Sequence, residues 1–261
     1  MLLPPRVSRD QAEEIAASRY GVSAAAERLA AEHDDTFRLV TADGPARLLK
    51  IALIPPGTPR DASASPVSFQ TAVLLHLARA APALPVQRVL GTLDGRPELY
   101  LDGRVVRMTS YLEGPTLGSR PASTALRRDI GGTLARLDQA LRPFAHPGAD
   151  RTHLWDLQNF HQLRPLLGQL PGQLADRDQR AALVSCLDRF EAQVLPRLAD
   201  PATRRQVIHT DFHGDNLLVD GDRVTGVLDF GDSLAGPVAM DVGVAACYQF
   251  GADAGTDPLI P

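Results

Sequence analysis

Lysine is almost missing from this sequence of 261 residues: Lys50 is the single lysine, and the other basic residues are arginines. Long hydrophobic runs are missing too, since none approaches the roughly 18 residues that a membrane-spanning helix requires. The first ten residues, MLLPPRVSRD, have neither the basic region nor the apolar region of a secretory signal. We therefore expect no membrane partner and a cytoplasmic location.

Cysteine is also scarce. Cys186 and Cys247 show no CxxC or Cys/His spacing, which argues against a zinc site and predicts two reduced, buried thiols. The net charge of -4 and a pI near 6.0 give no basic footprint, and the arginines are scattered without interleaved aromatic residues. Nucleic acid is therefore not an expected partner, and the sequence gives no indication of the oligomeric state.

The first half of the chain has the pattern of a small α+β unit. A helix is predicted over 8–21, with Ser8 as its cap and Gly21 past its end. Two strand-like runs flank Asp43 and Gly44, the turn chemistry of a tight hairpin, and Lys50 falls in the second of them. The remaining predicted elements of this half are a helix over 68–81 and a strand pair formed by 86–93 and 105–112.

The pattern changes after the sequence YLEGPTLG. Residues 121–195 are dominated by helical spacing of apolar residues, and short β-runs return at 216–220 and 223–230. We place the boundary between two lobes at Glu113 and Gly114, which gives lobes of residues 1–113 and 114–261.

The densest chemical signal is the run from His209 to Asn216, which includes Asp211, followed by Asp229 in the sequence LDFG. Phosphoryl transfer needs a carboxylate that accepts the hydroxyl proton and oxygen ligands that hold Mg²⁺ on the nucleotide phosphates. In kinases the carboxylate and an amide ligand lie five residues apart, and a second carboxylate follows a short hairpin. Asp211, Asn216 and Asp229 match that arrangement, although aspartates in such a loop also favour plain turns.

On these motifs the sequence resembles the aminoglycoside phosphotransferase superfamily of protein-kinase-like small-molecule kinases. The stretches LARLDQALRPFAHPGADRTHLWDLQN and GVLDFGDSLAGPVAMDVGVA resemble its hydroxylysine-kinase-like branch. The resemblance implies an α+β, two-lobed fold with a small antiparallel-sheet N-lobe that binds nucleotide and a mainly helical C-lobe. It also implies Asp211 as catalytic base, His209 as the residue that orients its loop, and Asn216 and Asp229 as Mg²⁺ ligands.

The same resemblance implies that Lys50 contacts the phosphates of ATP or GTP and that main-chain groups near Ser110 and Leu112 bind the base. Arginine brings a wide planar fork in place of a compact ammonium, which would explain why one lysine is retained. The sequence departs from the family here, because the helix after Lys50 has no acid and offers Gln70 as its best polar partner. The turn expected to cover the phosphates, around Asp34, also lacks glycine.

The acceptor is predicted from charge alone. Seven aspartates lie between Asp211 and Asp241, more than Mg²⁺ requires, so an amine-bearing alcohol is favoured over an anionic one. The candidate substrate contacts are Asp156, Asp215 and Asp232, with Trp155 as a possible lining residue.

Two other functions remain open. One is a kinase-like module that binds nucleotide without turnover, as in a fusion with an aminotransferase. The other is a metal-dependent hydrolase built on His209, Asp211, His213 and Asp229. The resemblance also implies helices well beyond the DFG turn, whereas this sequence stops 30 residues after Gly231, so we expect an incomplete C-lobe.

Overall fold

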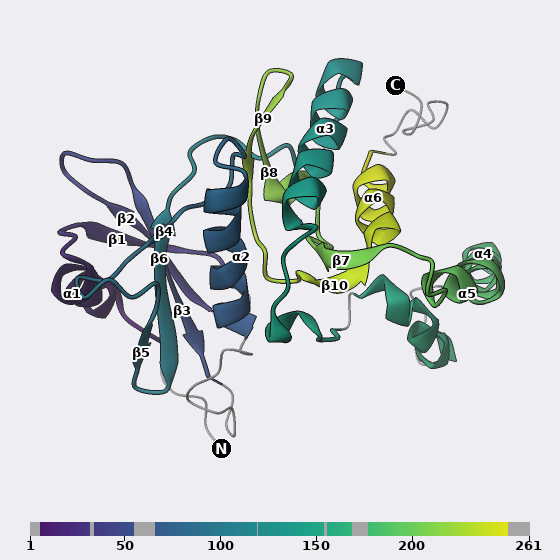
Figure 1. Cartoon of the computed structure of the whole chain (residues 1–261), viewed down its shortest axis with the longest axis horizontal. Coiled ribbons are helices and arrows are strands. Elements are labelled where there is room, and N and C mark those ends of the chain that lie inside the picture. The colour runs from purple at the N-terminus through teal and green to yellow at the C-terminus, as the bar shows by residue number, and fades with distance from the viewer. Residues whose placement is uncertain are drawn as a thin grey trace.

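Six antiparallel strands form one sheet in the N-terminal half of the protein (Figure 1). The structure is a computed structural model that describes residues 6–31, 34–54, 66–118, 120–153, 156–168 and 177–249. Trp155 and the segment 250–261 lie outside the described residues. The strand order is β1-β2-β3-β6-β4, with β5 also paired to β6. The strands are β1 (Ala25–Leu29), β2 (Asp35–Val40), β3 (Arg47–Leu53), β4 (Val89–Leu90), β5 (Leu99–Leu101) and β6 (Arg104–Ser110).

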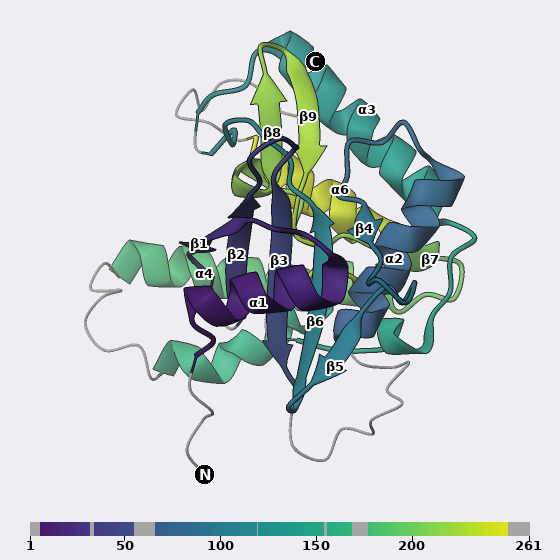
Figure 2. The same ribbon diagram turned by 90° about the vertical axis from the view of Figure 1, so that its left-hand side faces the viewer.

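Helix α1 (Arg9–Tyr20) lies across one face of this sheet (Figure 2). Ser8 forms a capping box with Gln11, and Gly21 ends the helix with a φ of 68°, a conformation that glycine adopts without steric cost. The helix buries Ala12 and Ala16 against apolar strand residues such as Phe37. The helix and both of its predicted end signals are therefore confirmed.

The hairpin that carries Lys50 has a wider connection than the sequence predicts. Leu39 pairs with Arg47, so the chain turns through residues 40–46 rather than through a two-residue loop. Within it the Thr41 hydroxyl donates to the Gly44 carbonyl at 2.7 Å, which stabilises the longer turn. The predicted pairing of 86–93 with 105–112 is confirmed as β4–β6, and the turn-rich segment between them adds the short strand β5.

Helix α2 (Pro66–Ala80) joins the two halves of the protein. Its buried residues Phe69, Val73 and Leu77 belong to the hydrophobic cluster that also contains residues of α3 (Thr124–Leu141) and of the small C-terminal sheets. In Figure 1 this helix stands between the large sheet and α3. Helix α2 is therefore anchored in the C-terminal core.

The C-terminal half combines helices with two two-stranded sheets, β7–β10 and β8–β9. The helical prediction for 121–195 holds for α3 and α4, but 157–168 form a 3₁₀ segment that contains Pro165, a residue without the N–H of an α-helix. The elements are η1 (Pro147–Ala149), η2 (Leu157–Gly168), α4 (Arg177–Arg189), the π-helical η3 (Phe190–Val194), α5 (Leu195–Leu198), β7 (Arg205–Ile208), η4 (Gly214–Asn216), β8 (Leu217–Asp220), β9 (Arg223–Val227), β10 (Leu234–Pro237) and α6 (Val238–Cys247).

The two cysteines correct one expectation. Cys186 and Cys247 are free thiols, as predicted, but both are exposed rather than buried. Cys186 lies on the outer side of α4, where its sulfur accepts a hydrogen bond from Arg189 at 3.7 Å. Helical spacing predicts a helix from apolar residues but does not fix which of them face a core, and Cys186 faces solvent.

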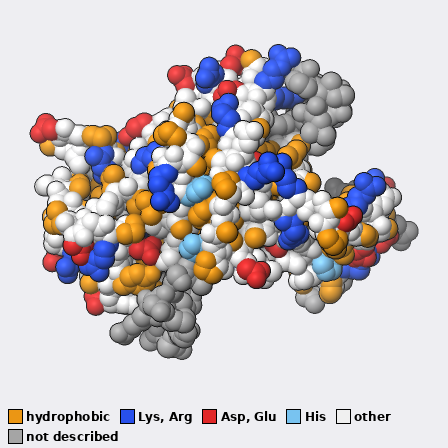
Figure 3. All heavy atoms as spheres, viewed as in Figure 1, with side chains coloured by type: hydrophobic (Ala, Val, Ile, Leu, Met, Phe, Trp, Pro, Cys, Tyr) orange, Lys and Arg blue, Asp and Glu red, His pale blue; other side chains and the backbone are white. Residues whose placement is uncertain are grey.

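The face of the molecule drawn in Figure 3 carries side chains of both charges. Figure 3 shows basic side chains in separate groups with acidic and apolar side chains between them. Among the described helices, none combines the length and the apolar character needed to cross a membrane.

Candidate active site

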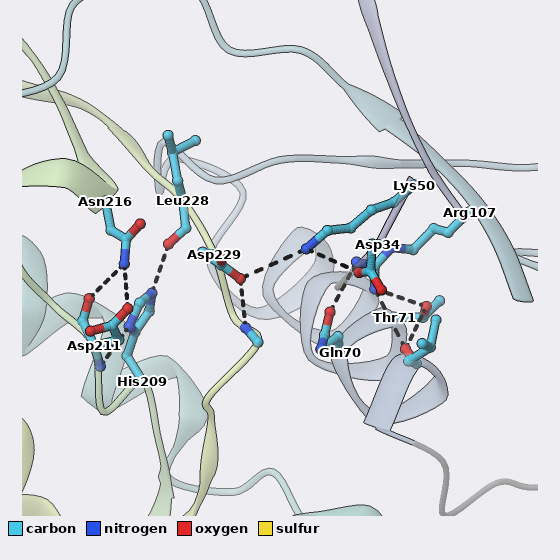
Figure 4. Close-up of polar contacts among 12 residues, drawn as sticks. Asp34, Lys50, Gln70, Thr71, Arg107, His209, Asp211, Asn216, Leu228 and Asp229 are labelled. Atoms are coloured by element: carbon cyan, nitrogen blue, oxygen red, sulfur yellow. Dashed lines mark hydrogen bonds and ion pairs between the residues drawn. The ribbon is translucent and has the colours of Figure 1, made fainter. Parts of the chain in front are cut away.

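A cleft of about 1460 Å³ lies between the large sheet, α2 and the loops of the C-terminal half. It brings together residues that are far apart in the sequence, including Lys50, Asp211, Asn216 and Asp229. Figure 4 shows two groups of polar side chains, one around Asp211 and one around Lys50, with Asp229 between them. The principal residues predicted from the motifs thus share one cavity.

The backbone of the loop before Asp211 is held by a buried carboxylate. Asp241, on α6, accepts hydrogen bonds from the N–H groups of His209 at 2.8 Å and Thr210 at 2.6 Å. Thr210 has a φ of 68°, which is costly for a β-branched residue and persists only where the surroundings impose it. Asp241 and the Thr210 hydroxyl, which donates to the Asp232 carbonyl at 2.8 Å, supply that constraint.

His209 is fully buried, and both of its ring nitrogens contact the backbone. Nε2 lies 2.9 Å from the Leu228 carbonyl oxygen, and Nδ1 accepts from the Asp211 N–H at 3.3 Å. This pattern assigns the proton to Nε2 and leaves neither nitrogen for a metal ion. The arrangement fits a residue that orients the loop, and it argues against the metal-dependent hydrolase.

Asp211 is fixed at the cleft by its neighbours in the same loop. Asn216 donates through Nδ2 to the Asp211 carboxylate at 2.7 Å and to its carbonyl oxygen at 3.0 Å. His213 Nε2 lies 3.3 Å from the other carboxylate oxygen, and the His213 ring stacks on Tyr248 with a centroid distance of 4.8 Å. The motif leaves position 213 free, so its contact with Asp211 was not predicted from the sequence.

Asp229 and the two residues after it form a constrained turn. Asp229 has a φ of 52°, and its Oδ1 accepts the Gly231 N–H at 2.9 Å. Arg151 donates to the Gly231 carbonyl at 2.5 Å, and His153 contacts the Asp232 carbonyl at 2.9 Å. Two side chains of the segment before η2 thus hold the backbone carbonyl groups of this turn, and no sequence motif indicated this role.

Lys50 has carboxylate partners, although none comes from α2. Its Nζ lies 3.7 Å from Asp34 and 3.9 Å from Asp229, and 24% of the side chain is exposed. Asp34 precedes β2 at the turn expected to cover the phosphates, whereas Asp35 is turned away to pair with Arg28 at 2.6 Å. The acidic partner expected on the helix is therefore replaced by Asp34, directly before β2.

Gln70 contacts a different cation from the one expected. Its Oε1 accepts from Arg107 Nη2 at 3.1 Å (Figure 4). Arg107 lies on β6 directly opposite Lys50 on β3, so both side chains leave the same face of the sheet. Arg107 was missed by sequence reasoning, although a charged residue inside the apolar run VVRMT was the signal that could have found it.

Of the two residues proposed for base binding, Ser110 and Leu112, one lines the cleft and the other does not. Leu112 lines the cleft. Ser110 is engaged away from it, because its N–H donates to the Arg88 carbonyl at 2.8 Å and its hydroxyl accepts the Arg88 N–H at 2.9 Å. The connection beyond β6, rather than Ser110 itself, is therefore the segment that faces the cleft.

The three aspartates predicted to contact the substrate also differ in whether they line the cleft. Asp232 lines the cleft. Asp156 is buried and caps the start of η2 by accepting the Gln158 N–H at 3.0 Å. The Asp215 side chain is 76% exposed, near His213 but outside the cleft lining. Of these three, the structure brings only Asp232 to the cavity.

The cleft offers oxygen atoms suited to a divalent cation. Among the described residues, the hydrogen bonds of the Asn216 side chain run through Nδ2, which leaves Oδ1 as a ligand atom. The Asp229 carboxylate lines the same cavity. An amide oxygen and a carboxylate are the donors that Mg²⁺ prefers, so this pair fits the implied metal.

A second buried carboxyl group contacts the Asp241 anchor. Burial, with a smaller contribution from the nearby Asp241, raises the pKa of Asp138, on α3, to about 7, and Arg204 opposes the change. Burial likewise raises the pKa of Asp241, whereas His209 and the two N–H groups lower it. The carboxyl group of Asp138 thus lies next to the carboxylate that anchors the loop, and burial favours its protonated form.

We expect this pair to make stability depend on pH. The folded-state pKa of Asp138 lies above its ordinary value of 3.8, so its stabilising contribution is complete below about pH 3.8 and is lost as the pH rises through 7. Asp138→Asn removes this proton, so the melting temperature of the variant relative to wild type should rise between pH 4 and pH 8. Thermal unfolding at several pH values measures this difference. Asp10→Asn, at an exposed site in α1, is the control, and parallel curves for Asp138→Asn and wild type would contradict the assignment.

The fold matches solved structures of small-molecule kinases. An amicoumacin kinase solved with AMP-PNP and Ca²⁺ aligns with a TM-score of 0.66 at 15% identity, over 92% of this chain and 68% of that one. A microcompartment-associated aminopropanol kinase aligns with a TM-score of 0.64 at 20% identity, over 92% and 74% of the two chains. These matches confirm the expected two-lobed kinase-like fold.

Sequence comparison adds curated relatives. Hydroxylysine kinase of Danio rerio is 25% identical over 267 residues, which cover 94% of this chain and 71% of the relative. Homoserine kinase of Zymomonas mobilis is 30% identical over 62% of this chain and 47% of its own length. Hydroxylysine kinase of Mus musculus is 30% identical, and the match covers 56% of this chain and 40% of that relative. The chain thus spans less than half the length of two of these three relatives.

The model of the phosphotransferase enzyme family matches residues 25–260, a range that contains Lys50, the loop of Asp211 and Asn216, and the turn at Asp229. This chain belongs to the phosphotransferase enzyme family, and its relatives place it among the small-molecule kinases.

Proposed function

We propose that this protein transfers the γ-phosphoryl group of ATP or GTP to the hydroxyl group of a small alcohol that also carries an amine. The observation that carries the proposal is the Asp211 carboxylate, held at 2.7 Å by Asn216 in the cleft that also contains Asp229 and Lys50. A base, two oxygen ligands and a phosphate-binding cation are the parts that phosphoryl transfer uses.

In this proposal Asp211 accepts the proton of the acceptor hydroxyl as its oxygen attacks the γ-phosphorus. The bond between that phosphorus and the bridging oxygen of the β-phosphate breaks, and the nucleoside diphosphate leaves. Asp241 and His209 act through the backbone, because they hold the loop in the strained geometry that aims Asp211 into the cleft. Such positioning lowers the barrier by fixing the reacting groups before the reaction begins.

Asn216 and Asp229 would hold Mg²⁺, which when bound neutralises charge on the nucleotide phosphates. Lys50 supplies a compact positive charge from the large sheet, and its ammonium group lies 3.9 Å from the Asp229 carboxylate. The connection that includes Leu112 borders the cavity and would contact the base.

The acceptor class rests on charge and on the relatives. Of the seven aspartates between Asp211 and Asp241, only Asp211, Asp229 and Asp232 line the cleft. With Asp211 as base and Asp229 as metal ligand, Asp232 is left to attract a substrate ammonium group. The compounds in the names of three relatives, hydroxylysine, homoserine and aminopropanol, each carry a hydroxyl group and an amine, which agrees with this assignment.

The direct test is formation of nucleoside diphosphate with Mg·ATP and Mg·GTP and a panel of acceptors. We expect turnover with hydroxylysine, homoserine, 1-amino-2-propanol or an aminoglycoside, and none with 2-propanol, which keeps the alcohol but lacks the amine. Thermal stabilisation by nucleotide with no transfer to any acceptor would instead support the nucleotide-binding module.

Replacement of Lys50 tests its part in the site. Lys50→Arg keeps the charge, but we expect kcat/KM to fall by about 10- to 100-fold. A planar guanidinium beside Arg107 is wider than an ammonium group and would place the positive charge at a different point in the cleft. Steady-state kinetics with the best acceptor measures this, and Arg79→Lys, an exchange at an exposed site in α2, is the control. Unchanged kcat/KM would show that any cation serves at this position.

A further inference from the structure

Arg107 is the second cation on the nucleotide side of the cleft. It is the cross-strand partner of Lys50 in the β3–β6 ladder, and both residues line the cavity. The two differ in exposure, because Arg107 is buried whereas Lys50 is only half-buried. Figure 4 shows both side chains extending from the sheet toward Asp34 and α2.

Helix α2 holds the guanidinium through uncharged groups. Nη2 donates to Gln70 Oε1 at 3.1 Å, and Nη1 donates to Thr71 Oγ1 at 3.2 Å. The Thr71 hydroxyl donates in turn to Glu98 Oε2 at 2.9 Å, so a hydroxyl group stands between the guanidinium and that carboxylate. Within the described part of the chain, Arg107 Nε is buried with no hydrogen-bond partner.

Among the hydrogen bonds of the described residues, none joins this guanidinium directly to a carboxylate, and the residue opposite it is another cation. A buried charge is costly unless a counter-charge pairs with it, and like charges directly opposite on neighbouring strands repel. Burial accordingly lowers the pKa of Arg107, while Glu98, Asp34 and Asp229 oppose the shift by Coulomb attraction. A ligand that carries several negative charges would relieve both penalties at once.

We propose that Arg107 and Lys50 together form a two-cation seat for the polyphosphate of the nucleotide, with Gln70 aiming the guanidinium. The inference rests on the proposed function, because it assumes a nucleotide donor in this cleft. It also explains how phosphates are held beside a turn that has no glycine in residues 29–36. Positive side chains would replace the backbone N–H groups that a glycine-rich turn presents.

The test is calorimetric binding of adenosine, ADP and ATP to wild type and to Arg107→Met, which keeps an unbranched apolar side chain but removes the charge. We expect Arg107→Met to weaken ATP by about 10- to 100-fold, ADP by less, and adenosine not at all. Arg107→Lys should recover part of the ATP affinity. Arg79→Met, which removes a cation from an exposed site on α2, should bind all three ligands like wild type.

Gln70→Glu keeps the contact and tests the proposal even if Arg107→Met does not fold. A carboxylate at position 70 would neutralise the buried guanidinium, so we expect the melting temperature to hold or rise while ATP affinity falls and adenosine affinity stays unchanged. A residue that serves only to attach α2 to the sheet would give a higher melting temperature with unchanged ATP affinity.

The two proposals fail in different ways. ATP binding that is the same in wild type, Gln70→Glu and Arg107→Met would overturn the two-cation seat and leave the proposed function intact. Equal losses for adenosine and ATP in the variants would also overturn the seat, since they indicate a structural role. A wild-type protein that binds neither ATP nor GTP would overturn the proposed function and the seat together.

Discussion

Replacing Asp211 with asparagine is expected to lower phosphoryl transfer by about 10²- to 10⁴-fold, the usual contribution of a positioned general base. The side chain keeps its shape, and an amide oxygen can still accept the 2.7 Å hydrogen bond from Asn216. What is lost is the capacity to take the hydroxyl proton. The loss should therefore fall on kcat, while the melting temperature and the affinity for ATP stay close to those of wild type.

Single-turnover assays with Mg·ATP, together with calorimetric ATP binding, separate these effects. Asp220→Asn is the matched control, because Asp220 lies at the exposed end of β8, a few residues after the loop of Asp211 and outside the cleft. Near-normal kcat in Asp211→Asn would remove Asp211 from the role of base. Loss of ATP binding in parallel with kcat would show that the substitution disturbs the site rather than the chemistry.

The sequence predicted the elements whose signals are local. Ser8 begins α1 with a side-chain cap and Gly21 ends it with a positive φ, and the run from His209 to Asn216 lies in one loop, as its spacing predicts. Asp229 follows a hairpin whose turn residues were recognisable. Each of these features depends on neighbours only a few residues away, so local sequence patterns were enough to predict it.

The contacts that the sequence did not predict depend on register and on packing across the chain. Lys50 lies beside Asp34 because β2 pairs with β3 so that Thr36 is opposite Lys50, and Gln70 contacts Arg107 because β6 pairs with β3 at that residue. Asp156 became a cap of η2 because Gln158 and Asn159 turn back toward it. A contact between residues that are far apart in the chain produces no local pattern in the sequence, so it could not be predicted.

Gly214, in the loop that contains Asp211 and Asn216, lies against Gly118 in the segment after β6. A Cβ at this position would lie 2.0 Å from the Gly118 carbonyl oxygen and 2.9 Å from its carbon. The Gly118 N–H also donates to the Gly214 carbonyl at 2.9 Å, so the two backbones run in close contact. Because the obstructing atoms belong to the backbone, no side-chain rotation can relieve the overlap.

Gly214→Ala is therefore expected to destabilise the protein by roughly 2–3 kcal/mol, as overpacking does, and to lower kcat about 100-fold by displacing Asp211 and Asn216. Thermal unfolding and steady-state kinetics measure the two losses. Gly131→Ala adds the same methyl group on α3, where nothing lies within 4 Å, and should stabilise by about 0.5–1 kcal/mol with unchanged kcat. Since the same chemical change is expected to act with opposite sign at the two sites, equal melting temperatures for the two variants would contradict a close approach between Gly214 and Gly118.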